Sequence, residues 1–142
     1  MSGRPGVGEQ IIVIELDDRG DERGASFSLR TAELARIGPI QDVHVAAVRP
    51  GHVRGNHFHT SRRELITVVY RGAWSLHWDT GPGTPNAERT FTGAGAVLVV
   101  VPVGWAHAVR NDGAEDLWLF AASDAAYRPD RPDAERRIVT EG

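Results

Sequence analysis

The sequence predicts an all-β fold, an antiparallel sandwich or barrel formed by a single domain. Short apolar or alternating stretches recur along the 142 residues, and 16 glycines and 8 prolines punctuate them. Helix signals are confined to one short segment, so strands do not alternate with helices as they do in parallel α/β folds. No linker, repeat or low-complexity tract divides residues 1–142, and this length suits one hydrophobic core.

Seven stretches have the composition of strands, because they are rich in β-branched and aromatic residues and end at turn residues. In chain order they are residues 10–18, 40–48, 64–72, 73–80, 96–102, 107–110 and 115–123. In the fourth stretch, Trp74, Leu76 and Trp78 share one face and His77 lies on the other. The tripeptide Asn-Asp-Gly at 111–113 predicts a tight hairpin between the last two strands.

The other segments join or cover these strands. One helix is expected within residues 28–38, where Thr31 would cap its start and Gly38 would end it. The polar segment 124–142 follows the strand core of about residues 10–123 and is expected to cover it. Turns rich in Gly, Pro, Asp and Arg occupy residues 18–24, 49–55 and 81–86.

Composition excludes several classes of function. All 16 basic residues are Arg and 19 residues are acidic, so the net charge is −3 and no basic surface for nucleic acid or an anionic membrane is expected. The absence of Lys excludes Schiff-base chemistry, and the absence of Cys excludes disulfides, thiolate nucleophiles and Cys-bound zinc. The apolar run at 11–16 is too short for a signal peptide or a membrane span, which predicts a cytoplasmic protein.

Histidines gather in the segment 51–64, GHVRGNHFHTSRRE. His57 and His59 are two residues apart, so on a strand their side chains point to the same face. Glu64 begins the next predicted strand, and His107 lies far downstream. Three imidazoles and one carboxylate would form a site that suits Zn, Fe, Ni, Mn or Co and leaves positions open for water or substrate.

The spacing around these four residues resembles the two sequence motifs of the cupin superfamily. The first block runs from Gly51 to Gly72 and contains the first two histidines and the glutamate, although its closing Gly comes one position late. The second block is Pro-x-Gly-x-x-His-x-x-x-Asn at residues 102–111. This resemblance implies the double-stranded β-helix, or jelly-roll, barrel of the cupins, in agreement with the all-β prediction.

Three further stretches resemble the cupins that act on nucleotide sugars. GDERGASFSL at 20–29 and PGHVRGNHFH at 50–59 are similar to segments of dTDP-4-keto-6-deoxyhexose 3,5-epimerases and 3,4-ketoisomerases. The second stretch and the tail at 111–133, with its Ser-Asp and Pro-Asp pairs, also resemble the C-terminal cupin domain of capsular-polysaccharide enzymes that epimerise a UDP-linked 4-keto sugar. That domain normally follows a reductase domain, so this chain is expected to work alone or on a substrate that another protein prepares.

The resemblance implies a homodimeric isomerase or epimerase of a nucleotide-linked keto-deoxysugar, in polysaccharide or glycoside biosynthesis. In the capsular enzymes the matching cluster holds zinc, and no organic cofactor is expected. The resemblance therefore implies a divalent ion at the four matching positions, His57, His59, Glu64 and His107. In the ketoisomerases and 3,5-epimerases the pocket holds no metal, and a histidine matching His57 or His59 would itself move the proton.

If an ion occupies the four positions, another group must act as the base. The candidates are His44, His52, His77 and Tyr70. Arg54 is expected to bind the substrate phosphate or keto oxygen, and Asn56, Trp105 and His77 are expected to contact the sugar. Two other functions fit the same residues: an Fe(II)-dependent dioxygenase-type cupin, and a non-catalytic cupin that binds a sugar or another small molecule.

Overall fold

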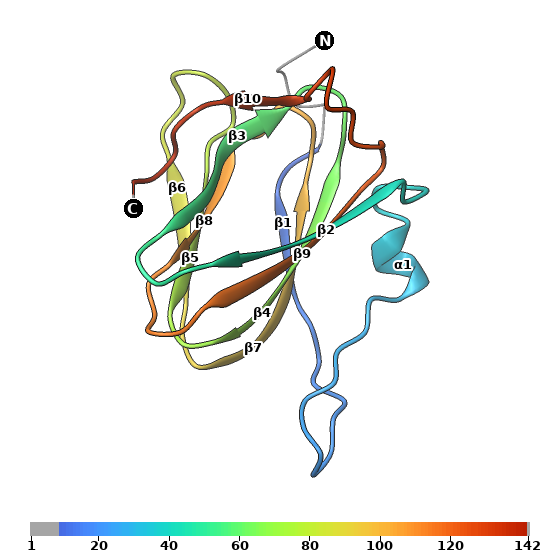
Figure 1. Cartoon of the computed structure of the whole chain (residues 1–142), viewed down its shortest axis with the longest axis vertical. Coiled ribbons are helices and arrows are strands. Elements are labelled where there is room, and N and C mark those ends of the chain that lie inside the picture. The colour runs from blue at the N-terminus through green and yellow to red at the C-terminus, as the bar shows by residue number, and fades with distance from the viewer. Residues whose placement is uncertain (1–8, 142) are drawn as a thin grey trace.

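The computed structural model describes residues 9–141, which form ten β-strands and one short helix (Figure 1). The prediction of an all-β chain is confirmed. The helix α1 spans Thr31–Leu34. The strands are β1 (Ile12–Glu15), β2 (Asp42–Val48), β3 (Val53–His59), β4 (Glu64–Arg71), β5 (Trp74–Trp78), β6 (Ala87–Phe91), β7 (Ala94–Val101), β8 (His107–Asn111), β9 (Leu117–Ser123) and β10 (Ala134–Arg136).

The strands form two antiparallel sheets of five, in the orders β1-β7-β4-β9-β2 and β10-β3-β8-β5-β6. The sheets face each other across the core (Figure 1). Strands that follow one another in the chain frequently belong to opposite sheets, as β3 and β4 do, and β4 and β5. Residues far apart in the sequence therefore become neighbours, and His57 pairs with His107 across β3 and β8.

The core between the sheets is filled by the inward faces of these strands. Trp74 and Leu76 of β5 are fully buried, as the alternation of this strand predicts. Trp74 stacks on Phe91 with ring centroids 4.2 Å apart. His77, on the other face of β5, is buried as well.

The segment around α1 covers part of the outer face of the first sheet. Ile37 is buried against Leu65 of β4 and against Leu98 and Val100 of β7. This contact explains why β7 is apolar on both faces, since one face lines the core and the other lies under this segment. On the second sheet, Val139 of the C-terminal segment packs in the same way on the alanines of the 106–108 region.

The Asn-Asp-Gly turn does not form the predicted hairpin, because β8 and β9 belong to different sheets and residues 111–113 carry the chain from one sheet to the other. The buried Asn111 side chain holds this crossing. Its Nδ2 donates to the carbonyl oxygens of Val48 (2.8 Å) and Glu115 (2.7 Å), and its Oδ1 accepts from the backbone N–H of Gly113 (2.9 Å). The prediction was wrong because local turn propensity does not indicate which sheet the next strand joins.

Several boundaries also differ from the predicted ones. The helix is a single turn whose N-cap is Arg30, so Thr31 is its first residue and not its cap. The backbone N–H of Arg30 donates to the Glu33 side chain (3.0 Å). β3 is not among the seven predicted strands and begins at Val53, inside the predicted turn 49–55. The sequence does not predict β6 or β10, because their residues are largely charged or exposed and become strands only by pairing with β5 and β3.

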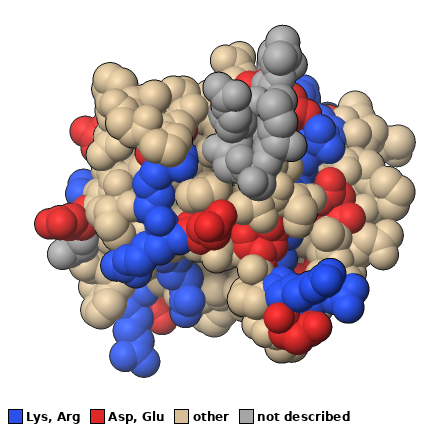
Figure 2. All heavy atoms as spheres, turned by 90° about the horizontal axis from the view of Figure 1, so that it is seen from above, with Lys and Arg blue, Asp and Glu red and all other residues tan. Residues whose placement is uncertain are grey.

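Acidic and basic side chains lie side by side on the face of the molecule shown in Figure 2. Among residues 9–141, no helix is both long and apolar enough to cross a membrane.

Candidate metal centre

A cavity of about 350 Å³ lies between the two sheets, and five strands form its walls. Its polar residues come from both sheets: Arg54 and His57 from β3, His107 from β8, Glu64 from β4 and His44 from β2. The other side chains that line it are apolar: Ala46, Val53, Ile66, Val109, Leu119 and Ala121. Apolar walls with a few convergent polar groups are typical of small-molecule sites.

β3 contains a bulge where it passes the cavity. The pairing with β8 shifts between Gly55 and His57, so Asn56 is an extra residue, and it has a φ of 58°. A Cβ at Gly55 would lie 2.5 Å from the carbonyl oxygen of His107, and only glycine fits so close to β8. Because the bulge absorbs one residue, Arg54 and His57 both line the cavity although they are an odd number of positions apart.

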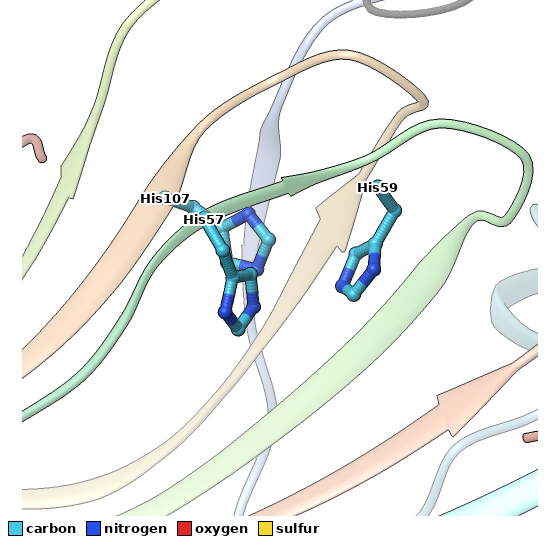
Figure 3. A group of neighbouring side chains, drawn as sticks. All are labelled: His57, His59 and His107. Carbon is cyan, nitrogen blue, oxygen red and sulfur yellow. The ribbon is translucent and has the colours of Figure 1, made fainter. Parts of the chain in front are cut away.

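Three imidazoles lie close together, as Figure 3 shows, and two of them line the cavity. His57 and His59 come from β3 and His107 from β8, and one ring nitrogen of each lies within 4.8 Å of the others. The ring centroid of His57 lies 4.9 Å from that of His59 and 5.0 Å from that of His107. His59 and His107 are buried, whereas His57 is half-buried and reaches the cavity.

Glu64 approaches the same rings from the opposite sheet. Its Oε1 lies 3.3 Å from Nε2 of His59 and 3.5 Å from Nε2 of His107. Burial alone would raise the pKa of the Glu64 carboxyl, but hydrogen bonds from His107 and His59 outweigh burial and hold the pKa well below its ordinary value. Burial, reinforced by His107 and His59, lowers the pKa of His57 to about 3. At neutral pH the cluster therefore contains a carboxylate and an uncharged His57 ring.

The hydrogen bonds of His107 show that the cluster fits a cation. Its Nδ1 lies 3.0 Å from the carbonyl oxygen of Trp105, which can only accept, so Nδ1 carries a proton. Nε2 then faces the Glu64 carboxylate either with a second proton, which forms the hydrogen bond that lowers the pKa of Glu64, or with a lone pair, which requires a cation between the two groups. Three imidazole nitrogens and one carboxylate oxygen are a donor set that Zn²⁺ and similar divalent ions prefer.

Two more of the predicted residues lie at the cavity. His44 lines it from β2 and is exposed to solvent. Arg54 lines it from β3, and its Nε donates to the carbonyl oxygen of Ala47 (2.6 Å). This bond fixes the base of the guanidinium, and the remaining N–H groups make no hydrogen bond with the residues that the structure describes.

Six candidate residues do not line the cavity: His59, which lies behind it in the imidazole cluster, and His52, Asn56, Tyr70, His77 and Trp105. The Asn56 side chain faces the C-terminal segment, where its Oδ1 accepts from the backbone N–H of Val139 (2.9 Å). Tyr70 packs edge-on against Trp74 in the core. His77 is buried on β5, with Nε2 2.8 Å from the hydroxyl of Ser75. Trp105 contributes only its backbone carbonyl, and His52 is exposed.

Two residues that the sequence analysis does not select contact His59. Nε of Arg62 donates to Nδ1 of His59 (3.2 Å), and Oδ2 of Asp133 lies 3.8 Å from the same atom. The sequence carries one signal for Asp133, the Pro-Asp pair of the tail. That pair occurs twice, at 129–130 and 132–133, and nothing in the sequence distinguishes the two.

Residues 19–135 match the sequence profile of the polysaccharide biosynthesis C-terminal domain family. The chain belongs to this family. The matched range contains all four residues of the cluster and extends to Asp133, so the candidate centre lies wholly within the polysaccharide biosynthesis domain. The resemblance to the cupins of polysaccharide biosynthesis is thereby confirmed.

Solved structures of sugar enzymes are similar to this polysaccharide biosynthesis domain. Capsular polysaccharide assembling protein CapF from Staphylococcus aureus is 26% identical with a TM-score of 0.62, over 69% of this chain and 26% of CapF. A 3,4-ketoisomerase from Helicobacter canadensis is 15% identical with a TM-score of 0.68, over 89% of this chain and 90% of that protein. NovW from Streptomyces spheroides, a 4-keto-6-deoxy sugar epimerase, is 22% identical with a TM-score of 0.68, over 89% of this chain and 69% of NovW.

These similarities confirm the cupin jelly-roll fold that the two sequence motifs imply. The chain spans about a quarter of the length of CapF, and it matches the ketoisomerase over nearly its whole length. A comparison with curated protein sequences finds no significant match.

Proposed function

We propose that this domain isomerises or epimerises a nucleotide-linked keto-deoxysugar, with a divalent ion held by His57, His59, Glu64 and His107. The observation that carries the proposal is a cluster of three imidazoles and one carboxylate, three members of which line a cavity of about 350 Å³, within the usual size range of small-molecule sites. The structural relatives support the reaction class, since they include a 3,4-ketoisomerase and a 4-keto-6-deoxy sugar epimerase. A further relative, QdtA, was crystallised with TDP-4-keto-6-deoxyglucose.

Both reactions begin with the loss of a proton from the carbon beside the keto group. A bound divalent ion would supply the positive charge that makes this proton more acidic. The apolar walls of the cavity exclude water from the sugar ring, which strengthens every electrostatic contact inside. Arg54 offers its free N–H groups to the substrate phosphate or to the keto oxygen.

His44 is the group that moves the proton in this proposal. With the other imidazoles and the carboxylate of the wall engaged as ligands, His44 is the remaining imidazole that lines the cavity. Its ring is exposed to solvent, and an imidazole can accept and donate a proton as a general base or acid. The other candidates for this role, His52, His77 and Tyr70, do not line the cavity.

Replacing His44 by Asn is expected to lower kcat by about 10²- to 10⁴-fold, the usual contribution of a general acid or base, while zinc binding is unchanged. The measurement is the uptake of deuterium from D₂O at the carbon beside the keto group of TDP-4-keto-6-deoxyglucose, followed by NMR. His52→Asn is the matched control, because that ring is exposed and outside the cavity. Full activity of the His44 variant would show that another group moves the proton.

The same assay separates the proposal from the two other functions. Substrate-dependent consumption of O₂ by the iron-loaded protein would indicate a dioxygenase-type cupin. Binding of the nucleotide sugar without deuterium uptake would indicate a non-catalytic binding protein. Full activity after complete chelation would assign the proton transfer to His57 or His59 directly. The cytoplasmic location expected from the sequence stays a prediction.

We also infer that the domain forms the homodimer expected from the sequence, through the uncovered part of the first sheet. Five large apolar side chains are exposed on the neighbouring strands β2, β9 and β4: Val43, Val45, Val69, Trp118 and Phe120. Strand pairing makes them contiguous, with Val45 opposite Phe120 and Val69 opposite Trp118. None of these five side chains is charged, so two identical copies can meet there without like-charge repulsion between them.

Replacing Trp118 by Glu is expected to convert the dimer into a monomer, because the symmetric contact would bury two new carboxylates. Light scattering coupled to size-exclusion chromatography gives the molar mass. Thr90→Glu is the control, since Thr90 is exposed on β6 of the other sheet. A monomeric wild-type protein, or a Trp118 variant that stays dimeric, would contradict the inference.

A further inference from the structure

The C-terminal segment lies directly beside the strand that carries two of the proposed ligands. β10 pairs antiparallel with β3, with Ala134 opposite His59 and Arg136 opposite His57. Asp133 immediately precedes β10. Its Oδ1 accepts hydrogen bonds from the backbone N–H groups of Thr60 (2.8 Å) and Ser61 (3.0 Å), and from the Thr60 hydroxyl. One carboxylate oxygen therefore fixes the turn that follows His59.

The other oxygen of Asp133 has no such partner. Oδ2 is buried, makes no hydrogen bond with the described part of the chain, and lies 3.8 Å from Nδ1 of His59 and 4.0 Å from Nε of Arg62. An unpaired buried carboxylate oxygen is costly, so this atom requires a donor. The nearest ring nitrogen can provide one only if it carries a proton.

Two groups compete for Nδ1 of His59. Nε of Arg62 donates to it at 3.2 Å, which requires a lone pair on Nδ1 and leaves the ring proton on Nε2, facing Glu64 at 3.3 Å. In that tautomer Nε2 is not available to a metal ion. In the other tautomer Nδ1 carries the proton, the Asp133 carboxylate is its natural acceptor, and Nε2 has a free lone pair.

We propose that Asp133 is a positioning residue that selects the metal-binding tautomer of His59, and that Arg62 opposes it by stabilising the other tautomer. This inference rests on the proposed function, because it concerns the same ion site. The change of tautomer leaves the number of protons on the ring unchanged: Nε2 releases one and Nδ1 gains one. Residues 132–136 are thus part of the site although they line no part of the cavity.

The variant Asp133→Asn separates the selection of the His59 tautomer from the structural role of Asp133, which is to fix the turn that follows His59. The Asn oxygen can still accept from the backbone of Thr60 and Ser61, while the amide nitrogen presents a donor to Nδ1 of His59. We expect zinc affinity, measured by competition with a chelator, to fall by about 10- to 100-fold, as for other outer-sphere partners of ligating histidines. The visible spectrum of the Co²⁺-loaded variant should also change, which a purely structural role would not cause.

The chain offers a matched control in its other Pro-Asp pair, at residues 129–130. Asp130→Asn removes the same charge from the same segment, but Asp130 is exposed and lies near Arg128 at the surface. This variant should bind zinc within about threefold of the wild type, in keeping with the small effect of exposed charges. Equal affinities of the Asp133 and Asp130 variants would overturn the inference.

Arg62→Met tests the proposal from the opposite side and does not depend on the folding of the Asp133 variant. It should bind zinc more tightly than Arg63→Met, which removes an equal charge from a side chain that bonds to Glu9 and not to His59. Equal affinities of these two variants would contradict the competition for Nδ1. If the wild-type protein does not bind zinc, both the proposed ion site and this inference are wrong. If deuterium uptake is absent while zinc affinities follow the expected order, the proposed reaction fails and the role of Asp133 stands.

Discussion

Replacing Gly55 by Ala is expected to lower the free energy of unfolding by about 3 to 5 kcal/mol, the sum of backbone strain and overpacking. Gly55 has a φ of 115°, which an L side chain rarely adopts. The new Cβ would lie 2.5 Å from the carbonyl oxygen of His107 and 2.8 Å from Cα of Ala108. Both are backbone atoms and cannot rotate away, so β3 and β8 must separate. Urea denaturation of the ion-free protein measures the loss.

Gly72→Ala is a close control for this variant. Gly72 has a φ of 116°, but a Cβ there would meet nothing within 4 Å. Gly72→Ala should therefore lower the free energy of unfolding only by the backbone strain, about 1 to 2 kcal/mol. Because separation of β3 from β8 also displaces His57 from His107, we expect Gly55→Ala alone to weaken zinc binding. Equal losses of stability in the two variants would show that the close approach of β3 to β8 at Gly55 does not cause the loss.

Replacing Glu64 by Gln is expected to weaken zinc binding by more than about 100-fold, beyond the range for outer-sphere partners, because a ligand itself is lost. The amide is nearly isosteric with the carboxylate but carries no charge, and its oxygen is a poorer ligand. Deuterium uptake by the sugar should fall with the ion. The ion-free Glu64→Gln variant should retain the fold, since Glu64 is the first residue of β4 and its side chain contacts His59 and His107.

Glu88→Gln is the control for the loss of charge. Glu88 also lies beside an imidazole, with Oε2 3.6 Å from Nδ1 of His77, but on β6 and away from the cavity. Zinc affinity of this variant should match that of the wild type. If the Glu64 variant binds zinc as tightly as the Glu88 variant, the proposed ligand set is wrong.

The sequence predicts most of the strands because each depends on local composition. The alternation of Trp74, Leu76 and Trp78 and the apolar run of β7 both indicate the faces that are buried. β6 and β10 are not predictable in this way, because their residues carry no such pattern and pairing with a neighbour makes them strands. The hairpin predicted at 111–113 is wrong for a related reason, because the strands on either side of this turn belong to different sheets.

The four residues of the candidate centre were selected from motif spacing, and the structure brings them together. His57 and His59 are fixed by the period of two within a strand, and their meeting with His107 and Glu64 follows from the resemblance to the cupin motifs. Strict alternation would place Arg54 on the face opposite His57. The bulge at Asn56 reverses this assignment, so Arg54 lines the cavity and Asn56 faces the C-terminal segment.

By itself the sequence determined the all-β class, the absence of lysine and cysteine chemistry, and the choice of the four residues of the candidate centre. The first two properties follow from composition and from short-range periodicity, which a chain carries before it folds, and the four residues follow from the resemblance to the cupin motifs. Only the tertiary structure decided that His44 and Arg54 reach the cavity, that Tyr70 and His77 do not, and that Asp133, not Asp130, contacts His59. These outcomes depend on strand register and on contacts between distant segments, which local patterns do not encode.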